Sequence, residues 1–272
     1  MFDEIMNPYM NFYWTGAFFI LGALFGSFAN VAIYRIPKEE SVVTTGSHCY
    51  GCKNPVKFYD NIPILSWLIL RGKCRNCGAK FSFRYCLVEI ITAFLFAGTF
   101  MKLGWSFFLL EVLVLILGLV IVSFIDIDHF IIPDKISLPG IVIGLVGGLL
   151  NPERTFVDSL LGMLLGGGFL WAVAYVYFLL KKEEGMGGGD IKLLAWIGAI
   201  LGWMSIPFII LGSSILGSIV GLLIIWKSKD TNSSGMKTVI PFGPYIAFAA
   251  ILYIFGGEAI GKWYINLFMP GL

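Results

Sequence analysis

The sequence predicts an all-α polytopic membrane protein with about eight transmembrane helices and one small polar domain between the first two. Of its 272 residues, 58% are hydrophobic and 13% are charged, and the mean hydropathy is +0.85. Soluble domains carry roughly 25% charged residues. Apolar runs of about 20 residues recur, the length of a membrane-spanning helix, without the alternation of a β-barrel. The polar stretch after the first run carries paired cysteines, which predict a metal-stabilised unit.

Eight apolar segments predict the helices in chain order. They cover approximately residues 11–34, 86–103, 106–124, 136–150, 156–180, 191–202, 205–226 and 242–267. The fourth and sixth are shorter than the about 20 residues of a full span, so we expect them to be tilted or partly buried in the bundle. The expected domains are a first transmembrane helix at 1–34, a cytoplasmic metal-binding domain at 35–85 and a helical membrane domain at 86–272.

The distribution of Lys and Arg predicts the orientation in the membrane. With the N-terminus outside and all eight segments crossing, 16 of the 19 basic residues face the cytoplasm, and only Lys102, Arg154 and Lys262 face outward. Cytoplasmic loops carry such an excess of basic residues. The first residues include Asp3 and Glu4 but no Lys or Arg, so we expect the first segment to remain as an anchor rather than to be a cleaved signal peptide.

Two C-x-x-C pairs predict a zinc-ribbon-like unit in the loop between the first two helices. The four cysteines are Cys49, Cys52, Cys74 and Cys77. Four thiolates satisfy tetrahedral zinc, in a closed site that is structural rather than catalytic. The cytoplasmic location argues against structural disulfides. A redox pair or buried thiols without a ligand are the alternatives.

Other residues of this loop are less informative. His48 precedes the first pair and is more simply a bystander, and Cys86 lies outside the quartet and is expected to fill apolar space. The basic residues are explained by the positive-inside rule and by anionic lipid, so nucleic acid is not an expected partner.

Carboxylates beside hydrocarbon are the strongest functional signal of the chain. Asp126 ends one apolar segment and Asp190 begins another, and the predicted topology places both at the cytoplasmic face. The simpler explanations are a solvated helix end for Asp126 and Asp128, and a helix N-cap for Asp190 and Asp134. Three features favour chemistry instead: the Gly run before Asp190, the convergence of the two acids on one face, and the absence of another nucleophile with an evident base.

A pair of close carboxylates shares one proton, because both cannot ionise cheaply. The ionised member would activate water against a peptide carbonyl, and the protonated member would polarise that carbonyl. Gly187, Gly188 and Gly189 would let an extended substrate approach the backbone. Lys192 could pair with a carboxylate or contact an acidic residue of the substrate, or simply mark the membrane boundary. A transporter with proton-relaying carboxylates and a scaffold without chemistry are the alternatives from other classes.

With these motifs the chain resembles the bacterial type IV prepilin leader peptidases, bifunctional peptidase/N-methyltransferases of the inner membrane. The segments that carry the resemblance are Gly26–Val31, Tyr34–Pro37, the two cysteine pairs, Tyr59–Trp67, Arg84–Glu89, Asp126–Asp134 and Gly187–Ala195. The match covers nearly the whole chain, and it differs at Cys86, where a proline is common. In this family the first Asp of the first aspartate motif and the Asp of a GxGD motif are catalytic, which correspond to Asp126 and Asp190.

The resemblance implies two reactions. The aspartates would cut a short basic leader from a type IV prepilin or a pseudopilin at the cytoplasmic face. The enzyme would then methylate the new N-terminal amine with S-adenosylmethionine, since members without the zinc loop are generally peptidases only. The residues that could bind this cofactor are Asp60, Asn61, Arg84 and Glu89, although packing and capping within the zinc domain explain them more simply.

Overall fold

The computed structural model describes residues 8–43, 46–152, 154–183, 187–228, 240–257 and 259. Within these ranges the elements are helical, apart from two isolated β-bridges that join His48 to Pro55 and Lys73 to Lys80. The all-α prediction is therefore confirmed. The chain divides into two compact units, Met1–Ile121 and Val122–Leu272, and the border lies inside a long helix, α4 (Phe107–His129).

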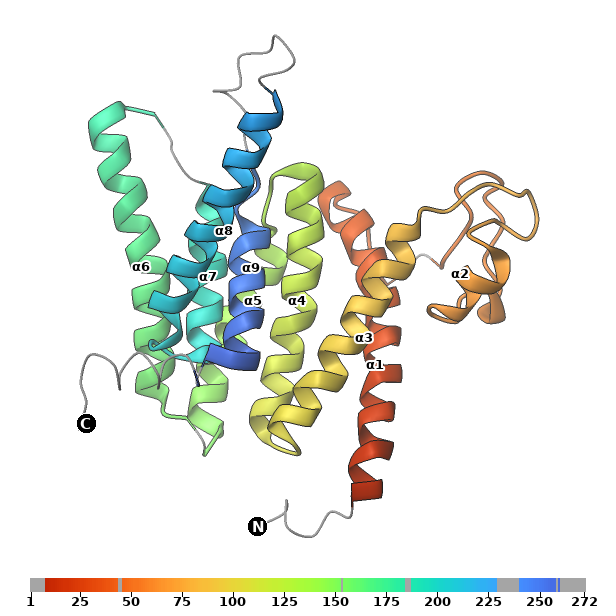
Figure 1. Cartoon of the computed structure of the whole chain (residues 1–272), viewed down its shortest axis with the longest axis horizontal. Helices are drawn as coiled ribbons and strands as arrows, with labels where there is room; N and C mark the ends of the chain where they lie inside the picture. The colour runs from red at the N-terminus through yellow and green to blue at the C-terminus, as the bar shows by residue number, and fades with distance from the viewer. Residues whose placement is uncertain are drawn as a thin grey trace. The chain divides into compact units, whose positions relative to one another are not determined.

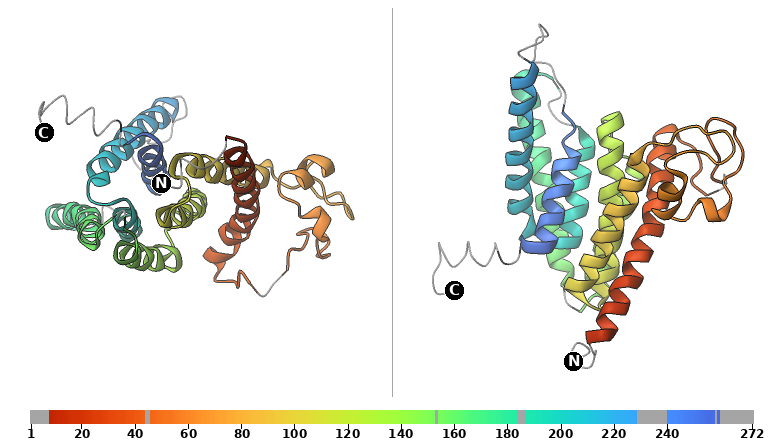
Figure 2. Two further views of the ribbon diagram at one scale, coloured as in Figure 1. Left: turned by 90° about the horizontal axis from the view of Figure 1, so that it is seen from below. Right: turned by 45° about the vertical axis from the view of Figure 1, so that its right-hand side comes forward.

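In the first unit, two long helices lie side by side and support the polar loop (Figures 1 and 2). These helices are α1 (Pro8–Arg35) and α3 (Phe83–Leu103). The loop between them holds a short helix, α2 (Leu65–Leu70), and 3-10 turns at Ile36–Lys38 and Phe58–Asp60. The hydroxyl of Ser82 accepts a hydrogen bond from the Arg84 N–H and so caps the start of α3.

Small residues and aromatic rings hold α1 against α3. A Cβ added at Gly22 would lie 2.7 Å from the Thr92 carbonyl oxygen, so only glycine allows this approach of the two backbones. Nearby, the rings of Phe18 and Phe100 stack with centroids 4.5 Å apart, and the Trp105 ring contacts both at 5.6 Å. The close contact lies toward the middle of α1, with the aromatic cluster one turn nearer its start.

The substitution Gly22→Leu is expected to destabilise the α1–α3 pair. Forcing extra carbons into a packed contact costs about 1–3 kcal/mol, and here the nearest atoms belong to the backbone and Cβ of α3. The thermal unfolding midpoint of the purified protein in detergent should fall. The matched control is Gly16→Leu on the same helix, where an added Cβ meets nothing within 4 Å. Equal midpoints for the two variants would contradict this packing.

In the second unit, a short helix forms the centre of a bundle. This helix, α7 (Gly188–Leu201), contacts α5 (Asp134–Leu150), α6 (Phe156–Lys181), α8 (Ser205–Ser228) and α9 (Gly243–Leu252). Every α7 residue from Leu193 to Ile200 is buried. A helix that is apolar on all sides is covered by protein, which is how a segment of 14 residues serves as a core element. A π-helical turn at Tyr253–Gly257 follows α9.

Arg154 caps the C-terminal end of α7. Its guanidinium donates hydrogen bonds to the carbonyl oxygens of Ala199 at 2.6 Å, of Ile200, and of Gly144 on α5 at 3.0 Å. The last carbonyls of a helix lack partners within the helix and attract a cation. The arginine therefore fixes the end of α7 opposite Asp190.

Among the described residues, five helices are long and apolar enough to cross a membrane: α1, α3, α4, α6 and α8. The two segments expected to be short, α5 and α7, have 17 and 14 residues. The last expected segment, 242–267, corresponds to α9 and the π-helical turn, and its end lies outside the described residues. These helices fit a membrane protein.

Candidate functional site

Asp126 lies in the last turn of α4 and is only 5% exposed. Its Oδ2 accepts a hydrogen bond of 2.9 Å from the backbone N–H of Gly243. Gly243 is the first residue of α9, followed by Pro244 in the first turn. The N-terminus of a helix favours a negative charge through its free N–H groups and its dipole. The helix start therefore stabilises the ionised form of this carboxyl group.

Gly243 is a site residue that the sequence analysis missed. The run Pro241-Phe242-Gly243-Pro244 is a recognisable helix start, because proline is favoured in the first turn of a helix. Its link to Asp126 joins residues 117 positions apart, and the sequence carries no pattern for that contact. A Cβ at Gly243 would lie 2.8 Å from Oδ2 of Asp126, so the position excludes a side chain.

Asp190 lies in the first turn of α7, in the same unit as Asp126. The N-cap of α7 is Gly187, which has no side chain that could cap the helix. The N-cap interpretation of Asp190 is therefore wrong, because Asp190 is the third residue of the helix. The Asp126 carboxylate is close enough to act electrostatically on Asp190. Both acids lie in the second unit, and a charge on one is felt by the other.

The glycines before Asp190 divide into two kinds. Among the described residues, an added Cβ would meet nothing within 4 Å at Gly187 or Gly188, whereas at Gly189 it would lie 2.7 Å from Cβ of Ile132. Gly189 therefore serves the packing of the α7 start against the chain that leaves α4. Gly187 and Gly188 leave open space two to three residues before Asp190. The first two residues of the run, Gly185 and Met186, lie outside the described residues.

Lys192 forms an ion pair with Asp134, with Nζ 2.6 Å from Oδ1. Asp134 is the first residue of α5 and its N-cap is Pro133, so the N-cap interpretation of Asp134 is wrong. The two side chains are 39% and 54% exposed, and an exposed pair contributes only about 0–1 kcal/mol. The pair links the starts of α5 and α7.

The four cysteines of the loop form a cluster that could hold a metal ion. Their Sγ atoms all lie within 4.8 Å of one another, and Cys49 Sγ lies 3.7 Å from Cys77 Sγ. Cys49 is buried and Cys77 is exposed, and all four are free thiols. The sulfur set matches the donors that tetrahedral zinc takes. Cys86 is buried on α3, as expected for an apolar filler, and His48 contacts the Gly46 carbonyl.

Each cysteine pair belongs to the same kind of turn. The Cys49 N–H donates to the Asn54 carbonyl at 2.9 Å, and the Cys74 N–H donates to the Ala79 carbonyl at 2.8 Å. Lys53 and Gly78, which directly follow the second cysteine of each pair, have φ values of 57° and 72°. The pKa of Cys49 is lowered to about 6, mainly by the hydrogen bond from the Cys52 backbone N–H and further by bonds from Gly51, Cys74 and Cys77. A thiolate is the form that binds metal.

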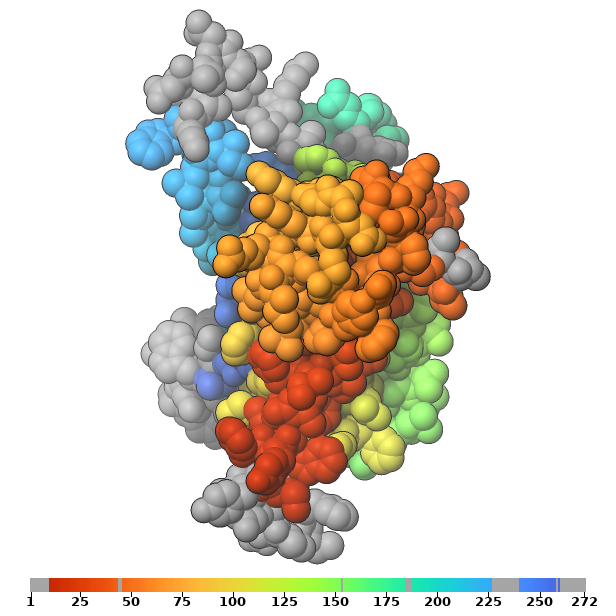
Figure 3. All heavy atoms as spheres, turned by 90° about the vertical axis from the view of Figure 1, so that its right-hand side faces the viewer, coloured from red at the N-terminus to blue at the C-terminus, as the bar shows by residue number. Residues whose placement is uncertain are grey.

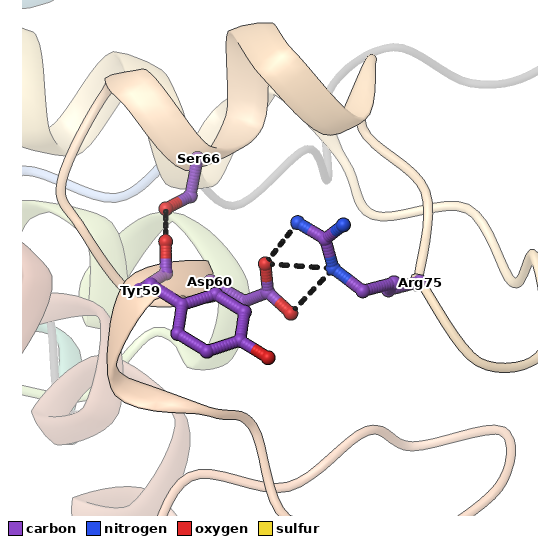
Figure 4. Close-up of polar contacts among 4 residues, drawn as sticks. All are labelled: Tyr59, Asp60, Ser66 and Arg75. Atoms are coloured by element: carbon purple, nitrogen blue, oxygen red, sulfur yellow. Dashed lines mark hydrogen bonds and ion pairs between the residues drawn. The ribbon is translucent and has the colours of Figure 1, made fainter.

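Of the four residues suggested for the cofactor, Asp60 is engaged by a neighbour (Figure 4). The Arg75 Nε lies 2.9 Å from Oδ2 of Asp60, and the terminal Arg75 nitrogen lies 2.6 Å from Oδ1. This pair holds the pKa of Asp60 below its usual value. Asn61 is exposed next to it.

Glu89 is different, because it is buried on α3. Its Oε2 accepts a hydrogen bond of 2.7 Å from the Ile64 N–H. Asp60, Asn61 and Glu89 line one cavity of about 660 Å³, and Arg84 is not among its lining residues. The capping and packing explanation therefore suits Asp60, and it also suits Glu89, which binds the backbone N–H of the α2 N-cap residue. Glu89 in addition lines the cavity.

Comparisons with known proteins agree on one family. Residues 20–103 match the bacterial peptidase A24 N-terminal domain, and residues 113–222 match the type IV leader peptidase family. A relative from Aeromonas hydrophila is 36% identical over 275 residues, covering 92% of this chain and 93% of its own. One from Pseudomonas aeruginosa is 35% identical, covering 91% and 92%, and one from Myxococcus xanthus is 39% identical, covering 81% and 65%.

All three relatives are described as prepilin leader peptidase/N-methyltransferase. No solved structure matches the chain. These relatives give no support to the transporter alternative.

Proposed function

Since this chain belongs to the type IV leader peptidase family, we propose that it removes the leader from type IV prepilins or pseudopilins and then methylates the new N-terminal amine. Asp126 and Asp190 are the proposed catalytic dyad. Peptidase and N-methyltransferase activities follow from the family. The observation that supports the dyad is the proximity of two carboxyl groups in one unit, one of them bound by a helix N-terminus.

The hydrogen bond from Gly243 supports an assignment of roles within the proposed dyad. Both acids lie near a helix N-terminus, whose dipole contributes about 0.3–1 kcal/mol at an exposed site. Only Asp126 also accepts a direct bond from that N-terminus, and a hydrogen bond to a charged group contributes about 1.5–3 kcal/mol. Asp126 is therefore the ionised base and Asp190 the protonated acid.

The reaction then balances as follows. Asp126 takes a proton from water while the water oxygen attacks the carbonyl carbon of the scissile peptide. The proton of Asp190 passes to the carbonyl oxygen, which forms a gem-diol. When the C–N bond breaks, the amine takes the proton held by Asp126, and the diol returns a proton to Asp190. The open space at Gly187 and Gly188 lets the extended substrate reach Asp190.

The substitution Gly243→Ala is expected to slow leader cleavage by about 10²-fold, the effect of a displacement of about 1 Å in a catalytic group. The added methyl group would lie 2.8 Å from Oδ2 of Asp126 and push the carboxylate aside. The matched control is Gly256→Ala in the following π-helical turn, where an added Cβ meets nothing within 4 Å. Initial rates on a synthetic prepilin peptide measure both. A normal cleavage rate for Gly243→Ala would show that the contact between Gly243 and Asp126 does not position the catalytic carboxylate.

The metal of the cysteine loop is proposed to be zinc in a structural role. Four sulfur donors fill a tetrahedral site and leave no position for substrate. Zinc would hold the two cysteine turns together in a loop with few apolar contacts. S-adenosylmethionine is the proposed methyl donor, and when bound it supplies an electrophilic methyl group.

The proposed location is the bacterial inner membrane, with the N-terminus outside and the dyad facing the cytoplasm. The distribution of Lys and Arg supports this orientation. The test of the whole function uses the purified chain in lipid vesicles, a prepilin peptide and S-adenosylmethionine. Mass spectrometry of the product is expected to show loss of the leader and gain of one methyl group. An intact peptide would overturn the peptidase, and a cut but unmethylated one would overturn the methyltransferase.

A further inference from the structure

The first unit contains a cavity that the proteolytic reaction does not use. Its volume is about 660 Å³, within the range of about 300–1,000 Å³ in which proteins bind small molecules and cofactors. Its walls come from α1, from the cysteine loop and from the start of α3. The loop forms a continuous surface patch (orange) beside α1 in Figure 3. The cavity therefore depends on the loop that distinguishes the bifunctional enzymes.

A buried acid lies in the wall of this cavity. Glu89 is 9% exposed and receives hydrogen bonds from the Ile64 N–H and the Ser27 hydroxyl. Within the described residues no cationic side chain forms an ion pair with it. Removing a carboxylate from water costs several kcal/mol unless a cation compensates. The wall of the cavity therefore presents a buried acid that a cationic group of a ligand would complement.

The backbone around Glu89 is strained in a way that suits a binding site. Ile64 has φ 65° and ψ −54°, a conformation that is rare for a β-branched residue. Such strain costs about 1–3 kcal/mol and persists where the surroundings hold it. Here the strained residue directs its N–H at the carboxylate of Glu89. The loop is thus shaped to fix the orientation of this acid.

The remaining walls suit a ligand that is both cationic and aromatic. Tyr34, Trp67 and Tyr85 line the cavity, and aromatic faces attract organic cations. Nε1 of Trp67 is buried and, among the described residues, has no hydrogen-bond partner. Lys57 and Lys73 are exposed lining residues and suit a carboxylate at the entrance.

We propose that this cavity is the S-adenosylmethionine site and that Glu89 binds a positively charged group of the cofactor. The ligand carries a sulfonium and an ammonium group, a carboxylate and an adenine ring, which match the acid, the lysines and the aromatic walls. Asp60 and Glu40 line the same cavity, but Asp60 is paired with Arg75 and Glu40 is exposed. Glu89 is therefore the buried acid that is open to the ligand. This inference rests on the proposed methyltransferase function.

The test is direct binding, independent of turnover. The substitution Glu89→Gln keeps an acceptor for the Ile64 N–H and removes only the charge. Equilibrium dialysis of purified full-length protein with radiolabelled S-adenosylmethionine is expected to show at least ~10-fold weaker binding, the effect of losing about 1.4 kcal/mol. The matched control is Glu111→Gln, another buried acid in this unit that does not line the cavity, and it should bind like the wild type.

A second measurement keeps the proposal testable if Glu89→Gln does not fold, as judged by lost leader cleavage. Ultraviolet cross-linking of radiolabelled S-adenosylmethionine to the wild-type protein should label peptides that contain Tyr34, Trp67 or Tyr85. Label only elsewhere, or normal binding by folded Glu89→Gln, would overturn the proposed site while the methyltransferase function stands. Wild-type protein that neither binds nor uses the cofactor would overturn the function itself.

Discussion

Replacing either Asp126 or Asp190 by asparagine is expected to reduce leader cleavage by on the order of 10³-fold or more, in line with the loss of general acid–base catalysis. Each substitution keeps the side-chain shape but removes a group that must carry or release a proton. Asp126→Asn also loses the charge that the Gly243 N–H binds. Initial cleavage rates of a prepilin peptide by the purified variants measure the effect.

The control for this prediction lies one half-turn away on the same helix. Asp128→Asn changes an exposed carboxyl group at the end of α4 and should cleave at the wild-type rate. Methyl transfer to pilin that has already been cut should persist in Asp126→Asn and Asp190→Asn, because the proposed cofactor cavity contains neither residue. If both variants cut normally, the dyad is wrong. If Asp128→Asn alone fails, the wrong acid was assigned.

Replacing Cys74 by serine is expected to empty the metal site. A structural zinc ion in such a site contributes about 10–16 kcal/mol of binding free energy. The three thiolates that remain in this partly exposed cluster should supply only a minor part of that binding free energy. The zinc content of the purified protein, measured by metal analysis, should fall well below about one zinc ion per chain, which is the content of a closed four-cysteine site. The loop should then become sensitive to protease, and methyl transfer should be lost.

Cys86→Ser provides the matched control. Cys86 is a buried cysteine on α3 outside the cluster, so its substitution should leave the zinc content unchanged. Leader cleavage should survive in Cys74→Ser, because the loop holds neither aspartate. Full zinc content in Cys74→Ser would show that the cluster does not bind the metal. Loss of zinc together with unchanged methyl transfer would separate the loop from that reaction.

Local patterns predicted the parts of the fold that depend on local physics. Hydrophobic runs predicted the helices within a few residues, because the length and composition of a run decide whether it spans a bilayer. The C-x-x-C spacing predicted a cluster whose sulfurs lie within 4.8 Å, because two residues between cysteines bring both sulfurs to one ion. The burial of α7 was foreseen only as one of two explanations for its short length.

The contacts that shape the two candidate sites could not be predicted in the same way. The bond from Gly243 to Asp126 and the bond from Ile64 to Glu89 each join segments far apart in the chain. Neither leaves a periodic signal, and a glycine at a helix start has several common explanations. Likewise the N-cap of α7 fell on Gly187 rather than Asp190, since glycine also serves that position and the choice depends on the neighbouring helices.

The position of Gly243 in the chain also has a consequence for the timing of activity. Ribosomes deliver the chain from its N-terminus, and its parts fold as they emerge. Both aspartates are synthesised before α9, so the early intermediate lacks the N–H of Gly243 that hydrogen-bonds Asp126. On the proposed mechanism, leader cleavage therefore starts only after α9 has packed against the end of α4.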